Sequence, residues 1–421
     1  TGVEAENIKT PAIASNKFPY TLETILVNTN NNEDIVLTNR GEKPASSFSI
    51  SMTSNTSGVI SMGAHTCTSS LSPGQSCTIP MSFSPNAHGQ FAEEISISYN
   101  NSFETASYTL PVSAYAANPA SLFFLDSPVF SIGSVVIGST NRYLIELANV
   151  GEWPANVVSD GGLGPRLSYA GGTFPGTNGN CFVPFIQGTT CFIDLTYSPL
   201  AIEVVADTLT VNYDDGYGGG VTNQSHSLSI TGAAATPADI VFDDAPSFDY
   251  GVLVYGTNSD NVFTIRNNGG SPATNLLGSS LAPLFSYTGS GFPGTNGTCT
   301  SILLPGASCD VEIRFAPIAS GIFTSPFIIA YNDGLTAVVE TMTISGEGIN
   351  PANLVISESP SYDFGVVLRN GTASKLFTVN NVGGADASAV SEVGLMPPFA
   401  FAGGTYPGTL GTCNVSGVIP Q

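Results

Sequence analysis

Residues 299–317 read CTSILLPGASCDVEIRFAP, and this stretch decides the fold class of the chain. After Cys309, the apolar Val311, Ile313 and Phe315 alternate with charged residues. A period of two is typical of an antiparallel strand that has one face in a core and the other in water. The Pro-Gly turn before Cys309 reverses the chain. The stretch therefore predicts a half-buried β-strand that follows a tight turn.

The same pattern recurs along the whole chain. The first cysteine of each copy lies at position 67, 181, 299 or 413, which gives a period of 114 to 118 residues. An apolar strand that ends in Asn-x-Gly, and a tyrosine followed by Asn or Asp, keep the same step. A fixed period indicates one structural unit per period. We therefore expect four units, called the first to fourth repeats, at 1–117, 118–235, 236–349 and 350–421.

The composition favours strands and turns within each repeat. The 421 residues include 46 Gly and 28 Pro, and 42% are hydrophobic, which is enough for real cores. About seven or eight short strands per repeat, with turn signals every 8–12 residues, fit an immunoglobulin-like sandwich. We therefore predict an all-β chain of tandem immunoglobulin-like β-sandwiches, three complete and one partial. Short junctions that contain proline, such as ITGAAATPADIV, predict an extended rod.

The charge balance restricts the partners of the chain. The net charge is −22, with only ten Lys and Arg residues. Phosphate backbones and anionic bilayers would be repelled by such a surface, so nucleic acid is excluded as a partner. No apolar run reaches the length of about 18 residues that a membrane-spanning helix requires. The chain begins at Thr1 without a basic and apolar leader, so any targeting peptide is expected to have been removed or to lie outside this sequence.

Motifs that carry catalysis are not recognisable in the sequence. Gly289, Gly291 and Gly294 match a GxGxxG pattern, but Pro293 interrupts it and related loops recur in other repeats. No helix is expected after this loop, so it does not predict a dinucleotide site. The three histidines lie far apart and are expected at the surface. We predict no enzyme activity, no catalytic residues and no cofactor.

Each complete repeat contains two cysteines that lie ten residues apart on either side of a turn. A turn of this kind folds the chain back and brings the two sulfurs together. The expected disulfides are Cys67–Cys77, Cys181–Cys191 and Cys299–Cys309. The alternatives are pairs of buried free thiols, or a zinc site, for which both the spacing and the scattered histidines are unsuitable. Because disulfides persist in oxidising compartments, we expect an extracellular or cell-surface protein.

Cys413 has no partner ten residues later, because the sequence stops at Gln421. The fourth repeat therefore lacks the segment that corresponds to the last strands of the other repeats. A sandwich without those strands would expose apolar edges. One hypothesis is that the sequence stops inside a repeat; the other is that a second chain supplies the missing strands.

Acidic turns follow the recurring tyrosines of the second and third repeats. Asp214, Asp215 and Asp333 lie in the sequences YDDGY and YNDGL. Clustered carboxylates suit calcium, which makes these residues weak calcium candidates. The alternative is that Asp-Gly supplies the positive φ of two-residue hairpins.

A second recurring loop precedes the first cysteine of three repeats, as GGTFPGTNGNC, GSGFPGTNGTC and GGTYPGTLGTC. Phe174, Phe292 and Tyr406 occupy the same place in these loops. They are candidates for a repeated contact surface that binds a glycan or a protein. Alternatively, each aromatic side chain caps its own sandwich.

The openings FDYGVLVYG and YDFGVVLRNG, the Asn-x-Gly strand ends and the cysteine motif together resemble the bacterial choice-of-anchor D repeats. These repeats belong to the Hydin-like (ASH) group of immunoglobulin-like domains. The first repeat departs from the pattern, because Thr21 stands where Gly133 and Gly251 stand and the glycine-rich loop is missing. The resemblance implies an extracellular or envelope protein of bacteria and no shared catalytic activity.

Three hypotheses for function follow. The first is a non-enzymatic structural protein of a bacterial surface, a stalk, fibre or filament segment that associates with itself and serves adhesion or assembly. The second is an array of carbohydrate- or protein-binding modules that uses the aromatic loops. The third is an accessory stalk of a larger secreted enzyme.

Overall fold

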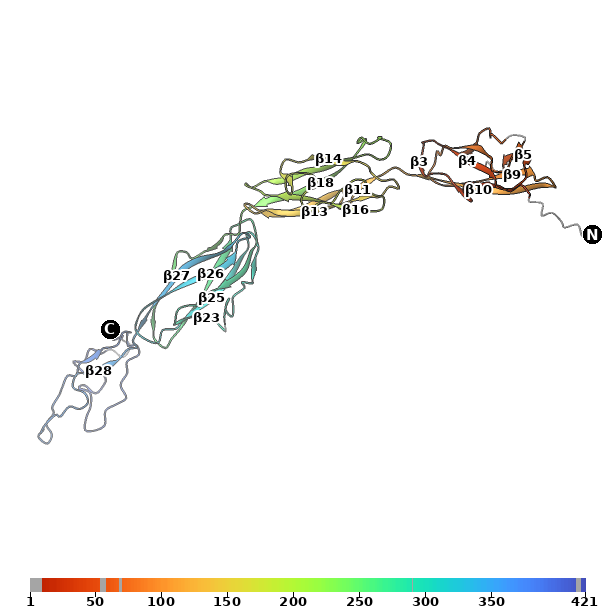
Figure 1. Ribbon diagram of the computed structural model, residues 1–421. Coiled ribbons are helices and arrows are strands. Elements are labelled where there is room, and N and C mark those ends of the chain that lie inside the picture. Colours follow the sequence, from red (N-terminus) through yellow and green to blue (C-terminus); the bar gives the residue numbers. More distant parts are fainter. Residues whose placement is uncertain (1–9, 54–57, 68–69, 290, 414–417) are drawn as a thin grey trace, which may run out of the picture. The chain divides into compact units, whose positions relative to one another are not determined.

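The computed structural model describes residues 10–53, 58–67, 70–289, 291–413 and 418–421 (Figure 1). Within these residues the secondary structure consists of β-strands joined by turns and loops. The fold is a series of tandem immunoglobulin-like β-sandwiches, which confirms the predicted fold class. No helix in the described residues is long and apolar enough to cross a membrane.

The first repeat packs two sheets face to face. One sheet has the order β1-β4-β8-β6 and the other has the order β2-β10-β9-β5-β7, with β3 also paired to β10. The strands of the first sheet are β1 (Ile13–Ser15), β4 (Asn31–Asn39), β8 (Ser76–Phe83) and β6 (Ile60–Met62). Those of the second are β2 (Tyr20–Thr21), β3 (Ile25–Leu26), β5 (Ala45–Met52), β7 (Ser70–Leu71), β9 (Gly89–Asn100) and β10 (Thr105–Ala117).

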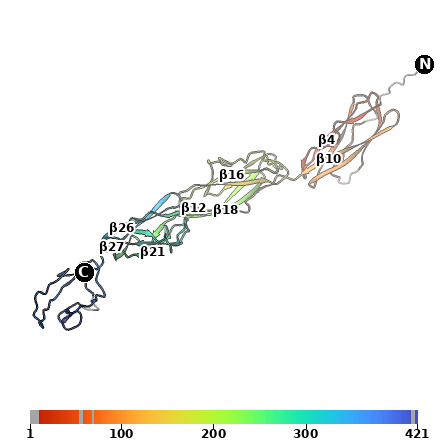
Figure 2. The ribbon, with the colours of Figure 1, turned by 90° about the horizontal axis from the view of Figure 1, so that it is seen from below.

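The second repeat has the same plan, and Figure 2 labels β16 from one of its sheets and β12 and β18 from the other. Its first sheet has the order β11-β13-β16-β15 and its second the order β12-β18-β17-β14. The first sheet contains β11 (Leu122–Phe124), β13 (Asn141–Asn149), β16 (Thr190–Tyr197) and β15 (Leu167–Tyr169). The second contains β12 (Val129–Val136), β18 (Gln224–Ala235), β17 (Val204–Tyr213) and β14 (Val158–Leu163).

The third repeat follows the same order with one more strand. Its sheets are β19-β21-β25-β23 and β20-β27-β26-β22-β24. The first contains β19 (Ile240–Phe242), β21 (Ser259–Asn267), β25 (Ser308–Phe315) and β23 (Phe285–Tyr287). The second contains β20 (Ser247–Val254), β27 (Ala337–Ile349), β26 (Gly321–Asn332), β22 (Ala273–Gly278) and β24 (Ile302–Leu303).

The described part of the fourth repeat forms one small sheet, in which β28 (Leu354–Ile356) pairs with β29 (Val379–Asn381). The three aliphatic side chains of β28 are all exposed. The 421 residues end before the segments that would correspond to β25, β26 and β27 of the third repeat. Other large apolar side chains of this repeat, such as Val366, Leu368 and Val393, are exposed as well.

The cores consist of the alternating residues that the sequence predicts. Val311, Ile313 and Phe315 of β25 are fully buried, and so are the corresponding Ile79 and Phe83 of β8. In β16 the same positions are held by Ile193, Leu195 and Tyr197, which are buried as well. The prediction of a strand with one face in the core is therefore confirmed in three repeats.

The Asn-x-Gly motif has one structural role in all four repeats. In the third repeat, Asn267 ends β21 and its side chain is fully buried. Its Nδ2 donates to the carbonyls of Ser271, at 2.8 Å, and Leu303, at 3.0 Å. Its Oδ1 accepts from the backbone N–H groups of Gly269, at 3.0 Å, and Asp239, at 3.1 Å. The side chain thus bonds four backbone groups, in the turn after β21, in the segment before β19 and at the end of β24, at one end of the sandwich.

The other three repeats make equivalent bonds from the last residue of the corresponding strand. The donors and acceptors are centred on Asn39, Asn149 and Asn381. Because each bond uses a backbone partner, the surrounding sequence can vary while the asparagine is retained.

The acidic turns are not two-residue hairpins, so this part of the prediction was wrong. In the third repeat four residues separate β26 from β27, and in the second repeat ten residues separate β17 from β18. The glycines still have positive φ, 107° at Gly216 and 100° at Gly334. The aspartate side chains close these longer loops by accepting from backbone N–H groups.

The chain divides into two compact units. The first comprises Thr1–Gly133, Thr140–Ser198 and Val204–Ala233, and the second Ser134–Ser139, Pro199–Glu203 and Ala234–Gln421. Two turns that the sequence analysis places in the second repeat thus group with the third repeat. The four repeat boundaries remain predictions.

Candidate functional site

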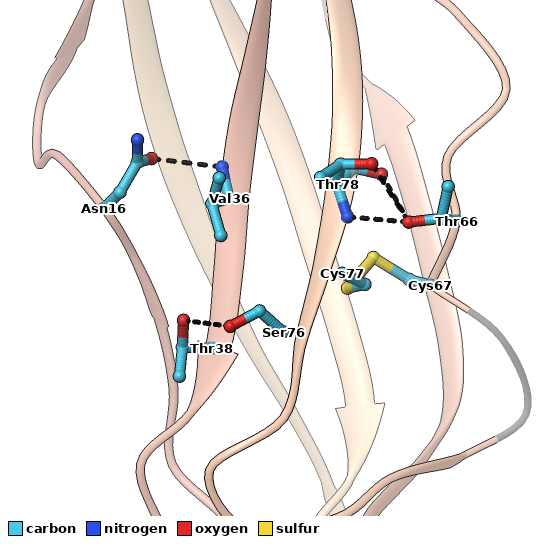
Figure 3. The surroundings of a disulfide bond; sticks show 8 residues. All are labelled: Asn16, Val36, Thr38, Thr66, Cys67, Ser76, Cys77 and Thr78. Carbon is cyan, nitrogen blue, oxygen red and sulfur yellow. Dashed lines mark hydrogen bonds between the residues drawn. A yellow bond between two sulfur atoms is a disulfide. The ribbon is translucent and has the colours of Figure 1, made fainter.

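Three disulfides staple the first three repeats. They join Cys67 to Cys77, Cys181 to Cys191 and Cys299 to Cys309, as predicted, and Cys413 is free. In each pair the second cysteine lies on a strand, β8, β16 or β25. The first cysteine lies on the segment before the turn that leads into that strand. Figure 3 shows the disulfide between Cys77, on β8, and Cys67, on the segment that runs beside it.

The residue before the first cysteine adds a second cross-link that the sequence analysis missed. Thr66 Oγ1 accepts from the backbone N–H of Thr78 at 2.8 Å (Figure 3). The same bond runs to the residue after the second cysteine in the other repeats. Asn180 Oδ1 accepts from Phe192 N at 2.6 Å, and Thr298 Oγ1 accepts from Asp310 N at 2.9 Å. A Thr or Asn next to the cysteine is the sequence signal for this bond.

Buried carboxylates hold the glycine-rich loops of the second and third repeats. Asp194 of β16 and Glu312 of β25 are buried, although strand alternation predicts that both face solvent. The loop from 171 to 180, and its equivalent in the third repeat, covers this face of the sheet. Asp194 Oδ2 accepts from Asn178 N at 2.9 Å, and Glu312 Oε2 accepts from Asn296 N at 3.1 Å. The expectation that these two carboxylates face solvent was wrong, because the glycine-rich loop, which is separate in the sequence from the strand, covers them.

Both carboxylates have further partners that keep them ionised. Burial opposes ionisation of Asp194, but the Arg142 guanidinium and the Asn178 N–H outweigh it and lower the pKa. Thr288 Oγ1 and the Asn296 side chain donate to Glu312 and lower its pKa, against a smaller effect of burial. An ionised carboxylate therefore lies beneath each glycine-rich loop and holds the loop backbone by hydrogen bonds.

The aromatic residues of these loops pack on their own sandwiches. Phe174 lies edge-on against Tyr169, with ring centroids 5.6 Å apart, and Phe292 lies in the same way against Tyr287. Tyr406 packs against Phe401 at 5.4 Å. All three side chains are half-buried. This geometry favours the capping alternative over an exposed contact surface.

The carboxylates of the acidic turns accept bonds from the backbone. Asp214, which is buried, accepts from the N–H groups of Gly216, Gly218 and Gly220 at 2.8–2.9 Å. Burial opposes ionisation of Asp214, but these three N–H groups prevail and lower its pKa. Asp333 Oδ1 accepts from Leu335 N and Thr336 N, both at 2.8 Å.

Asp215 Oδ1 accepts from Tyr217 N at 3.0 Å and from the Asn223 side chain at 2.5 Å. The described residues hold no group of three or more Asp, Glu, His or Cys side chains arranged to bind a metal. These contacts support turn closure rather than calcium binding as the role of the three aspartates.

The residue after Asp-Gly in each of these turns contacts the preceding repeat. Tyr217 OH donates to the carbonyl of Val27 in the first repeat. A Cβ on Gly216 would lie 2.7 Å from Leu26 Cδ1, so the turn is seated closely against this residue. In the third repeat, Leu335 lies beside Gly138, and a Cβ on Gly334 would lie 2.8 Å from Val136 Cγ2. The same turn therefore makes both junctions, although neither contact was predicted.

Glu152 adds polar contacts where the first repeat continues into the second. Its carboxylate accepts from Asn118 N at 2.8 Å and Tyr115 OH at 3.0 Å, and it lies 2.8 Å from His88 Nε2. The Asn118 N–H has the largest effect and, with His88 and Tyr115, lowers the pKa of Glu152. One side chain thus ties the end of β10 to the turn after β13.

His226 departs from the expected surface position. Its ring lies within 5.6 Å of the centroids of both Phe123 and Phe124, and its Nε2 is buried without a hydrogen-bond partner. Burial lowers the pKa of His226. In β18, His226 is in phase with the buried Leu228 and Ile230, so strand alternation was a signal for its inward position that the expectation of a surface histidine overlooked.

Comparison with known protein families gives a match in the first repeat. Residues 17–113 match the family model of the HYDIN/CFA65/VesB-like, Ig-like domain. This supports the Hydin-like part of the resemblance, in the repeat that departs most from the choice-of-anchor D pattern. No curated protein matches the chain.

Several solved structures resemble the chain at low identity. An endo-fucoidan hydrolase of glycoside hydrolase family 107 is 11% identical over 78% of this chain and 43% of its own, with a TM-score of 0.25. The VesB protease of Vibrio cholerae is 12% identical over 24% of this chain and 31% of its own, with a TM-score of 0.22. The human CEP192 ASH/PapD-like domain is 19% identical over 28% of this chain and 87% of its own, with a TM-score of 0.21. This chain therefore spans less than half of the hydrolase, whose activity belongs to that protein.

Proposed function

We propose that this chain is a non-enzymatic extracellular structural protein of a bacterial surface, a stalk, fibre or filament segment that serves adhesion or surface assembly. The observation that carries the proposal is the recurrence of one junction. Tyr217 and Leu335 hold equivalent positions in their turns, and each contacts the preceding repeat. A repeated junction of this kind suits a protein whose repeats act together as a mechanical series.

The disulfides support the extracellular part of the proposal. Each of the first three repeats has one, and disulfides persist in oxidising compartments rather than in the cytosol of most organisms. Mass spectrometry of the unreduced protein is expected to find six cysteines in the three pairs and Cys413 free. Seven free thiols would overturn the extracellular assignment.

Assembly is tested by negative-stain electron microscopy of native material, together with light scattering of the purified 421-residue chain. Filaments or fibres, and a scattering mass that rises with concentration, are the expected result. A scattering mass that stays at the monomer value of 43.3 kDa, with isolated particles only, would overturn self-assembly.

A further inference from the structure

The first repeat carries the same turn as the two that form junctions. Its sequence YNNSF corresponds to YDDGY and YNDGL, which places Phe103 where Tyr217 and Leu335 stand. Asn101 Oδ1 accepts from Phe103 N at 3.0 Å, as Asp215 accepts from Tyr217 N. The residue between them has positive φ in each turn, and at Ser102 it is 77°. The turn of the first repeat therefore has the backbone conformation that places Tyr217 and Leu335 in the other turns, and it places Phe103 in the same way.

Phe103 is the most exposed of the three side chains. Its exposed fraction is 61%, against 45% for Tyr217 and 42% for Leu335, which contact a neighbouring repeat. Large aromatic side chains at a surface are typical anchors of protein contacts. Phe103 therefore has the position and chemistry of a junction residue.

The surface that receives these turns has a defined form. It is a turn that begins at an aliphatic residue. The residue two positions later has positive φ, and the carbonyl of the aliphatic residue accepts from the backbone N–H three positions later. In the first repeat these are Leu26 and Asn28, where φ is 61°, and Thr29 N donates to Leu26 O at 3.2 Å. In the second they are Val136 and Gly138, where φ is 87° and Ser139 N donates to Val136 O at 3.0 Å.

The third and fourth repeats contain the same receiving turn. In the third, Val254 is half-buried, φ at Gly256 is 86° and Thr257 N donates to Val254 O at 3.1 Å. In the fourth, Gly371 N donates to Leu368 O at 2.8 Å, and Asn370 has a φ of 66°. Leu368 is 84% exposed, so its side chain is accessible to a partner. The charges next to the two elements are complementary, because Glu104 follows Phe103 and Arg369 follows Leu368.

We propose that the Phe103 turn of one chain docks on the Leu368 turn of a second copy, head to tail. This inference rests on the proposed self-association and identifies the surfaces that produce it. The occupant is a second copy because the two junctions inside this chain already seat the same turn on the same kind of surface. A head-to-tail contact leaves one turn free at each end of the pair, so the chain grows into an open filament.

The test uses two variants of the full chain, Phe103→Ser and Leu368→Ser, studied by sedimentation up to the highest soluble concentration because small contacts are weak. Each variant alone is expected to associate about tenfold or more weakly than the wild type. An equimolar mixture is expected to form dimers and nothing larger. If Phe103 docks on the Leu368 turn and not on the Val254 turn, only one pairing remains in it, between Phe103 of the Leu368 variant and Leu368 of the Phe103 variant, and species larger than dimers would overturn the choice of the Leu368 turn.

Phe182→Ser is the matched control, because Phe182 is 69% exposed on another loop. This variant is expected to associate like the wild type, and circular dichroism checks that all variants are folded. If the wild type assembles and the Phe103 variant assembles equally well, the contact is overturned while the proposed function stands. A wild type that stays monomeric would overturn self-association and the contact together. Loss in both variants without dimers in the mixture would overturn the pairing of these two surfaces.

Discussion

The asparagine at the end of β21 gives the sharpest test of how each repeat is held together. Asn267 is fully buried and joins four backbone groups. Asn267→Ala keeps the strand but removes all four bonds. We expect the third repeat to lose much of its stability while the first and second repeats keep theirs.

The magnitude follows from the groups left without partners. The carbonyls of Ser271 and Leu303 are buried at these bonds, and each costs about 1–3 kcal/mol when it has no donor. The N–H groups of Gly269 and Asp239 are partly exposed, so each loses about 1 kcal/mol or less. The sum is about 4 kcal/mol if water enters part of the space. A domain of this size is stable by about 5–15 kcal/mol, so the change removes a large fraction.

Hydrogen exchange followed by mass spectrometry measures the effect in the repeat concerned. A loss of about 4 kcal/mol corresponds to about a thousandfold lower protection of the amides of β21 and β25. Asn268→Ala is the matched control, because the neighbouring Asn268 side chain is exposed. The reasoning is refuted if Asn267→Ala costs less than about 1 kcal/mol, or if the control loses as much.

Three further changes test other contacts. Replacing Cys299 and Cys309 together by Ser should destabilise the third repeat by about 3 kcal/mol, because the short loop is no longer closed in the unfolded chain. A denaturant titration against the oxidised wild type measures the loss, and the reduced wild type is the control, which should resemble the variant. Burial lowers the pKa of His226, so the free energy of unfolding should be at its full value above pH about 6.5 and should fall as the pH drops below it. In His226→Phe, thermal unfolding between pH 5 and 7 should show a smaller dependence of stability on pH. Phe174→Ala with Phe292→Ala should leave any glycan binding on an array unchanged, because both rings cap their own repeats; saturable binding that this double variant abolishes would revive the binding-module hypothesis.

The sequence predicts the strands of each repeat better than the surfaces between them. Alternation over a short strand, as from Val311 to Phe315, depends on residues that are adjacent in sequence and need only one buried face. The cysteine pairs were equally predictable, because the intervening turn leaves the two sulfurs few other arrangements. Asn267 was recognisable as a landmark at a strand end, but two of its four partners, Asp239 and Leu303, come from segments distant in the sequence.

The junction residues could not be predicted from one repeat considered alone. Tyr217 and Leu335 share apolar character but not residue type, and the partners of both lie in the preceding repeat. Glu152 looks like a surface acid in a strongly acidic chain, yet it joins residues on either side of Asn118. In each case the contact depends on which segments meet in space, and periodicity carries no information about that.

The acidic composition therefore has two physical origins rather than one. Some carboxylates simply charge the surface, as the sequence analysis expected, but Asp194, Asp214, Glu152 and Glu312 each accept at least one backbone N–H. A chain with ten Lys and Arg cannot pair 32 acids with cations, whereas backbone N–H groups are available in every loop. The pKa of each of the four is lowered, mainly by backbone N–H groups for Asp214 and Glu152, by Arg142 and then Asn178 N for Asp194, and by the Thr288 and Asn296 side chains for Glu312. The stability these bonds supply is therefore present above the ordinary carboxyl pKa and is lost as the pH falls through the lowered values. Asp214 and Glu312 thus anchor their loops at neutral pH through uncharged donors, whereas Asp194 also uses Arg142, so a chain poor in Lys and Arg can hold long ordered loops with few ion pairs.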